Sequence, residues 1–135
     1  MTQHASGPFD VKLTPQQPDS EVAKAANLGR MTIDKQFHGD LNATSKGEMI
    51  AAQTQVKGSA GYVAVERVTG RLNGRQGSFA LQHIGVMDRG AAQLAITVVP
   101  DSGTDELTGL TGIMTITIVE KDHFYDFEYL VTTLA

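Results

Sequence analysis

Glu66 and His83 are the two side chains whose type and spacing best suit acid–base chemistry. They flank Asn73-Gly74, a dipeptide typical of two-residue β-hairpin loops because both of its residues tolerate a positive φ. This loop predicts that Glu66 pairs with Leu81 and that Ala64 pairs with His83. The acid and the imidazole then share one face of the hairpin, a diagonal step apart, and two long side chains can meet across that distance.

A carboxylate that orients an imidazole can hold or move a proton near neutral pH. The alternative is a buried hydrogen-bonded pair that only fixes the strand register, because burying either group without a partner is unfavourable. Both interpretations stay open, with Glu66 and His83 as the catalytic candidates and Tyr62 as a third member of the same face. The candidate ligand-contacting residues are Tyr62, Glu66, Phe79, Leu81 and His83.

Several other chemistries find no support in the residues. The chain has no cysteine, which excludes thiolate catalysis and cysteine-based metal sites. Its four histidines show no spacing typical of metal ligands, so we expect no metal and no cofactor. The glycine-rich stretches 70–75 and 101–112 do not open a helix, which makes them turns rather than phosphate-binding loops. Asp126 and Glu128 share a face, and we expect solvated outer-face charges there.

The elements that position the candidate pair are short strands with period-two alternation. The expected strands are 9–14, 31–37, 41–52, the two arms of 61–85, 92–99, 112–120 and 123–132. A short helical turn is expected at 21–26, and residues 1–8 are expected to be a flexible start of the single domain, 1–135. In the last hairpin we expect a turn at Lys121-Asp122 that pairs Ile118 with Tyr125.

About eight short strands with glycine-rich turns indicate an all-β fold, either a closed antiparallel barrel or a sandwich. Consecutive strands joined by short turns favour an up-and-down meander. At this point a single eight-stranded antiparallel up-and-down β-barrel and a sandwich both remain open. Closure would also remove the exposed sheet edges that promote aggregation.

Composition restricts the partners. The chain has 135 residues, of which 41% are hydrophobic, and a net charge of −4, which argues against nucleic-acid binding because that function requires a basic surface. No apolar run approaches the roughly 20 residues of a membrane-spanning helix, and residues 1–4 do not resemble a signal peptide. We expect a cytoplasmic protein without a membrane partner.

The central hairpin is apolar on both faces. Val63, Val65 and Ile84 lie opposite the face that carries Phe79 and Leu81. One face can pack inward and the other against a second subunit, so we expect a homo-oligomer, either a dimer or a trimer.

Three motifs together resemble a known bacterial family. They are the run 62–72 followed by 77–83, the run 98–104 followed by Glu106-Leu107 and Gly109, and Phe37 with Gly39-Asp40-Leu41. The chain resembles the family catalogued as domain of unknown function 3224 over essentially its whole length. The resemblance implies an eight-stranded barrel like that of allene oxide cyclase and dirigent proteins, and it supplies no activity. Together with the strand pattern, it leads us to predict a single eight-stranded antiparallel up-and-down β-barrel.

Three functional hypotheses follow. The first is a protein that binds a small apolar ligand in the barrel. The second is an allene oxide cyclase-like isomerase or cyclase that uses Glu66 and His83 on a lipophilic substrate. The third is a structural or interaction domain with a filled barrel, and a cavity of roughly 300 Å³ or more would separate the first two from it.

Overall fold

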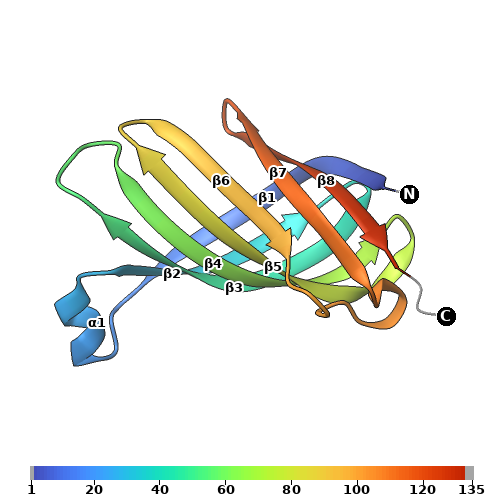
Figure 1. Cartoon of the computed structure of the whole chain (residues 1–135), viewed down its shortest axis with the longest axis horizontal. Helices are drawn as coiled ribbons and strands as arrows, with labels where there is room; N and C mark the ends of the chain where they lie inside the picture. Colours follow the sequence, from blue (N-terminus) through green and yellow to red (C-terminus); the bar gives the residue numbers. More distant parts are fainter. Residues whose placement is uncertain (1, 133–135) are drawn as a thin grey trace.

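The computed structural model describes residues 2–132 as a closed barrel of eight antiparallel strands in sequential order (Figure 1). The predicted all-β, up-and-down barrel is confirmed, and the sandwich alternative is wrong. The strands are β1 Gln3–Gln16, β2 Gly29–Phe37, β3 Leu41–Gln53, β4 Ala60–Leu72, β5 Arg75–Asp88, β6 Ala91–Val98, β7 Leu110–Val119 and β8 Asp122–Val131. Within residues 2–132, no helix has the length and apolar character needed to cross a membrane.

Two short helical elements interrupt the strand sequence. The expected helical turn is confirmed as α1, Glu21–Ala26, in which Ser20 Oγ accepts a hydrogen bond from the backbone N–H of Ala23. A 3₁₀ turn, η1, spans Asp105–Leu107 and buries Leu107.

The expectation of a flexible start is wrong for residues 3–8, while residue 1 lies outside the described residues. β1 begins at Gln3, which pairs with Tyr129 of β8, and from Phe9 onward the strand pairs with β2. In the sequence, Gly7-Pro8 is typical of the end of a strand, yet this part of β1 pairs with β8 and closes the barrel. Gly7 is needed there because a Cβ at this position would collide with the carbonyl oxygen of His38.

The predicted register of the central hairpin is confirmed. Asn73 and Gly74 form the two-residue loop with φ values of 47° and 86°. Ala64 therefore pairs with His83, and Glu66 pairs with Leu81.

The predicted register of the last hairpin is wrong, because the loop begins one residue earlier than expected. The loop consists of Glu120 and Lys121, so Ile118 pairs with His123 rather than with Tyr125. Glu120 adopts the positive φ, 58°, that the tight loop requires. The shift changes each pairing partner by two positions, which leaves every side chain on its predicted face.

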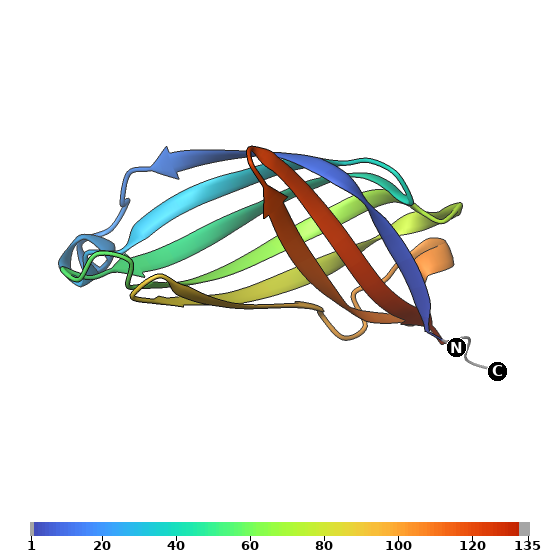
Figure 2. The same cartoon turned by 90° about the horizontal axis from the view of Figure 1, so that it is seen from above.

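One end of the barrel, here called the closed end, is filled with side chains. It holds the N-terminus of β1, the β2–β3 and β4–β5 turns and η1 (Figure 2). Tyr125 Oη donates to the carbonyl oxygen of His38 at 2.6 Å and accepts from the backbone N–H of Leu41 at 2.8 Å. Fully buried side chains in this part include Phe37, Leu41, Leu72, Phe79, Leu107, Leu110, Phe127 and Tyr129.

The opposite end, here called the open end, lies near α1 and the β3–β4, β5–β6 and β7–β8 turns. β6 and β7 pair only at Ile96 with Met114 and at Thr97 with Ile113, and the two strands then diverge (Figure 2). Leu94 and Ile118, on the faces that carry the buried Ile96 and Met114, are 44% and 61% exposed. The interior is therefore accessible to solvent at this end.

Candidate functional site

A buried polar cluster lies inside the barrel and is centred on Glu66. Glu66 Oε2 accepts hydrogen bonds from Lys35 Nζ at 2.8 Å and from His83 Nε2 at 2.6 Å, and Oε1 accepts one from Ser45 Oγ at 2.7 Å. Lys35, Ser45, Glu66 and His83, hereafter the Glu66 cluster, are all buried, and Glu66 is only 1% exposed. They are the buried polar and charged residues of the described chain.

Strand register brings the four side chains together, one from each of β2, β3, β4 and β5. Lys35 pairs with Ser45, and Glu66 pairs with Gly47, two positions along β3 from that serine. A Cβ at Gly47 would lie 2.7 Å from Cα and Cβ of Glu66 and would collide with the carbonyl oxygen of Val65. Glycine at this position therefore allows β3 and β4 to approach closely beside the carboxylate.

Glu66 is ionised in this environment. Burial alone would raise the pKa of its carboxyl group. The hydrogen bond from His83, the charge and hydrogen bond of Lys35 and the hydrogen bond from Ser45 outweigh burial and lower the pKa to about 2. Because an ionised carboxylate only accepts hydrogen bonds, Nε2 of His83 carries the proton between them.

Aromatic rings hold the ammonium group of Lys35 in place. Its Nζ lies 5.2 Å from the ring centroid of Phe9 and 5.6 Å from that of Phe37. Both distances are within the range of cation–π attraction. Lys35 is thus held by the carboxylate of Glu66 and by two aromatic faces.

A cavity of about 200 Å³ extends from the Glu66 cluster toward the open end. Its lining is mostly apolar and includes four residues with polar side-chain atoms, Lys35, Tyr62, His83 and His123. The lining residues are Phe9, Val11, Leu13, Ile33, Lys35, Met49, Tyr62, Ala64, His83, Leu94, Ile116, Ile118 and His123. A second, predominantly apolar hollow of about 380 Å³ lies at the rim and shares Met49, Tyr62, Leu94 and Ile118 with the first.

Tyr62 connects the cavity with the rim hollow. A side chain at Gly85, its pairing partner on β5, would collide with the Tyr62 ring, which therefore packs over the glycine. The ring centroids of Tyr62 and His83 are 6.5 Å apart. Burial and the negative charge of Glu66 raise the pKa of the Tyr62 phenol, so it remains protonated at neutral pH.

The predicted contact between Glu66 and His83 is confirmed, since the two side chains share the interior and bond directly. Tyr62 lies close by and lines the cavity. Phe79 and Leu81, also expected to contact a ligand, lie instead among the packed core residues and are absent from the cavity lining. Phe79 stacks on Phe127 with ring centroids 5.8 Å apart.

Sequence reasoning missed Lys35 and Ser45 as members of the site. Lys35 shares its inward face with Ile33 and Phe37, and a lysine among inward apolar positions indicates a buried anionic partner. Ser45 occupies the inward position of β3 between Ala43 and Gly47, and no comparable signal marks it.

The remaining charged candidates lie on the surface. Asp126 and Glu128 are exposed outer-face charges, as expected, and each lies about 4 Å from a ring nitrogen of His4. His38 lies at the β2–β3 turn, where its Nε2 is 3.0 Å from Asp10 Oδ2.

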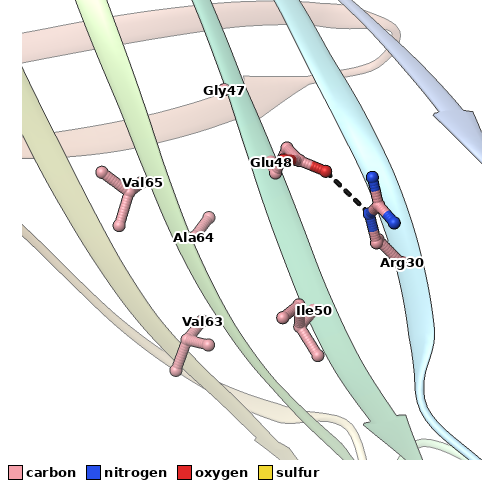
Figure 3. Close-up of a pocket in the computed structure, with 7 residues that line it drawn as sticks. All are labelled: Arg30, Gly47, Glu48, Ile50, Val63, Ala64 and Val65. Atoms are coloured by element: carbon pink, nitrogen blue, oxygen red, sulfur yellow. Dashed lines mark hydrogen bonds and ion pairs between the residues drawn. The ribbon is translucent and has the colours of Figure 1, made fainter. Parts of the chain in front are cut away.

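The outer wall over β3 and β4 carries exposed apolar side chains. Ile50, Val63 and Val65 project outward beside the ion pair between Arg30 and Glu48, whose Nε–Oε1 distance is 2.7 Å (Figure 3). These residues surround a shallow depression on the side of the wall away from the Glu66 cluster.

Comparison with known proteins agrees with the fold and with the motifs. A crystal structure of a protein of unknown function from the DUF3224 family of Shewanella oneidensis MR-1 is 50% identical in sequence, with a TM-score of 0.91. The match covers 99% of this chain and 100% of that one. No curated protein matches the sequence. The family model described as protein of unknown function (DUF3224) matches residues 5–129, and the chain therefore belongs to the DUF3224 family.

Proposed function

We propose that this protein binds a small, largely apolar molecule in the open end of its barrel. The observation that carries the proposal is the mostly apolar cavity beside the Glu66 cluster, which shares Tyr62 and Leu94 with the hollow at the rim. The inner cavity alone is smaller than a typical ligand pocket, and the rim hollow of about 380 Å³ reaches that size. A filled barrel would not leave this space.

The buried charges also support ligand binding at this end. Replacing a buried ion pair by well-packed apolar side chains is often neutral or stabilising, so stability alone does not explain the Glu66 cluster. The closed end of the same barrel is filled with apolar and aromatic side chains. A polar cluster beside an apolar cavity can orient a ligand that has one polar end.

Binding of the neutral dye Nile red, followed by its fluorescence, tests the proposal. We expect Leu94→Trp to weaken binding at least about tenfold, because Leu94 lines both hollows. The control is Ile113→Trp, on the outer face of β7 and 55% exposed, which should bind like the wild type. Absence of dye binding, or equal loss in both variants, would contradict the proposal.

A second candidate function is an isomerase or cyclase that acts on a lipophilic substrate within the cavity. It is supported by the contact between the ionised Glu66 and His83, because a carboxylate that fixes one imidazole nitrogen leaves the other free for proton transfer. In this candidate His83 moves the proton and Glu66 stabilises the charged ring.

Native mass spectrometry of protein purified from its own host distinguishes the two candidates. A retained molecule would then be incubated with the wild type and with His83→Gln. Conversion by the wild type that is lost in the variant would support the enzyme. Recovery of the unchanged molecule from both proteins would support binding alone.

We also propose that the chain self-associates, as a dimer or trimer, through the outer wall of β3, β4 and β5. Ile50, Val63 and Ile84 form one row across these strands, and all three are exposed. Exposed apolar patches of this kind are typical of interfaces. Light scattering should give a mass above the 14.4 kDa of one chain, and Val63→Ser with Ile84→Ser should restore that value. A wild-type mass of one chain at micromolar concentration would contradict self-association.

A further inference from the structure

On the side of the cavity formed by β4 and β5, two polar atoms have no protein partner among residues 2–132, namely His83 Nδ1 and Tyr62 Oη. The hydrogen bond of His83 is made through Nε2, and neither Nδ1 nor Tyr62 Oη takes part in another. Within the same residues, no buried side-chain nitrogen or oxygen lacks a partner. Both atoms are therefore accessible to solvent, and the two residues that carry them line the cavity.

The other members of the Glu66 cluster are already engaged. Both oxygens of Glu66 accept hydrogen bonds, and Ser45 donates to one of them. Lys35 donates to the carboxylate and lies over two aromatic rings. His123 also lines the cavity, and its ring nitrogens have no hydrogen-bond partner among residues 2–132. It comes from β8, across the barrel from Tyr62 and His83, and is only partly buried.

The charges of the cluster balance without a ligand. Lys35 neutralises Glu66 at a distance of 2.8 Å, so a charged imidazole would add an unbalanced positive charge to a buried site. With its Nε2 proton donated to Glu66, a neutral imidazole presents Nδ1 as an acceptor. The protonated phenol of Tyr62 presents a donor.

We propose that the ligand of this cavity carries an uncharged hydroxyl group on an apolar body. The hydroxyl oxygen accepts a hydrogen bond from Tyr62 Oη, and its proton is donated to His83 Nδ1. This inference rests on the proposed binding function and adds the class of the ligand, an apolar alcohol.

A charged end group fits this cavity poorly. A carboxylate would lie close to the full negative charge of Glu66, while the one ammonium group that lines the cavity is already paired. An ammonium would add positive charge beside Lys35. Either ion would lose its hydration without a free counter-charge.

Isothermal titration calorimetry at pH 7.5 tests whether the ligand is an apolar alcohol, using three molecules of the same chain length with different end groups. We expect octan-1-ol to bind at least about tenfold more tightly than octanoate or octylammonium. A second pair with a flat body, naphthalen-2-ylmethanol and naphthalene-2-carboxylate, should show the same order.

The outcomes separate this inference from the function on which it rests. If either carboxylate binds as tightly as its alcohol, or if Nile red binds and neither alcohol does, the hydroxyl class is wrong and the binding function stands. If Nile red and all five molecules fail to bind, the binding function itself is wrong.

Tyr62→Phe tests the anchor while keeping the ring over Gly85. We expect it to weaken octan-1-ol binding by about fivefold, the effect of one neutral hydrogen bond. The matched control is Tyr129→Phe, whose phenol bonds to Asn73 Nδ2 at 2.6 Å at the closed end, and it should not alter octan-1-ol binding. Unchanged alcohol affinity in Tyr62→Phe would contradict the anchor.

Discussion

The two ends of this barrel are built from the same eight strands and use their inward positions differently. At the closed end, aromatic and aliphatic side chains fill the interior. The hydroxyl groups of Tyr125 and Tyr129 form hydrogen bonds with residues of neighbouring turns. Toward the open end, the inward positions carry the Glu66 cluster, the half-exposed Leu94 and a cavity.

This contrast supports the proposal that stability and ligand binding lie in different parts of one sheet. The closed end has the packing that makes a small barrel stable without a ligand. The open end contains buried charges, and there β6 and β7 do not pair with each other over much of their length. A fold that is complete at one end can leave the other free for a ligand.

The largest difference between the two ends should appear in their response to truncation. Phe127→Ala removes a fully buried ring at the closed end and should lower the free energy of unfolding by about 3–5 kcal/mol. Ile118→Ala at the open end should change it by only about 0.5 kcal/mol, because that side chain is 61% exposed. Urea denaturation measures both values, and similar losses would contradict the contrast.

The Glu66 cluster should behave as a coupled unit. Glu66→Gln leaves the ammonium of Lys35 buried without its counter-charge, and we expect a loss of about 3 kcal/mol in unfolding free energy. Lys35→Met in the same chain should recover part of that loss. Double-mutant cycles of Glu66→Gln with Lys35→Met and with His83→Gln measure the coupling. Additive effects would show that the cluster does not act as one unit.

Lowering the pH should decrease the free energy of unfolding through protonation of Glu66 at the open end. The folded pKa of about 2 lies below the ordinary value of 4.5, so the unfolded chain binds the proton more tightly. The stabilisation, about 3 kcal/mol, is fully present above pH 4.5 and is lost as the pH falls toward 2. Urea titrations between pH 5 and 2.5 should show a steeper decline for the wild type than for Glu66→Gln. Parallel declines would contradict the lowered pKa.

The inward faces of the central hairpin were accessible from the sequence, because strand alternation determines which side chains face inward. Asn73-Gly74 was enough to place Glu66 and His83 on one face and in contact. The distribution of the filled and open parts was not accessible, since it depends on how far each strand extends. Phe79 and Leu81 share the face of His83, yet they lie in the part of the interior that other strands fill.

The cluster itself required contacts between strands distant in sequence. Lys35 meets Glu66 only because β2, β3 and β4 align in register, and no local signal reports that alignment. Gly7-Pro8 illustrates the opposite difficulty. Its local signal favours a break, and pairing with β8 overrides that signal.

Methyl ¹H–¹³C NMR spectra recorded with and without octan-1-ol test the central claim, that the open end binds ligands and the closed end does not. We expect the largest shift changes at Met49, Leu94 and Ile116, which line the cavity, and no change at Leu72 and Leu110, which are fully buried at the closed end. Changes at Leu72 and Leu110, or changes confined to the outer wall, would contradict the claim.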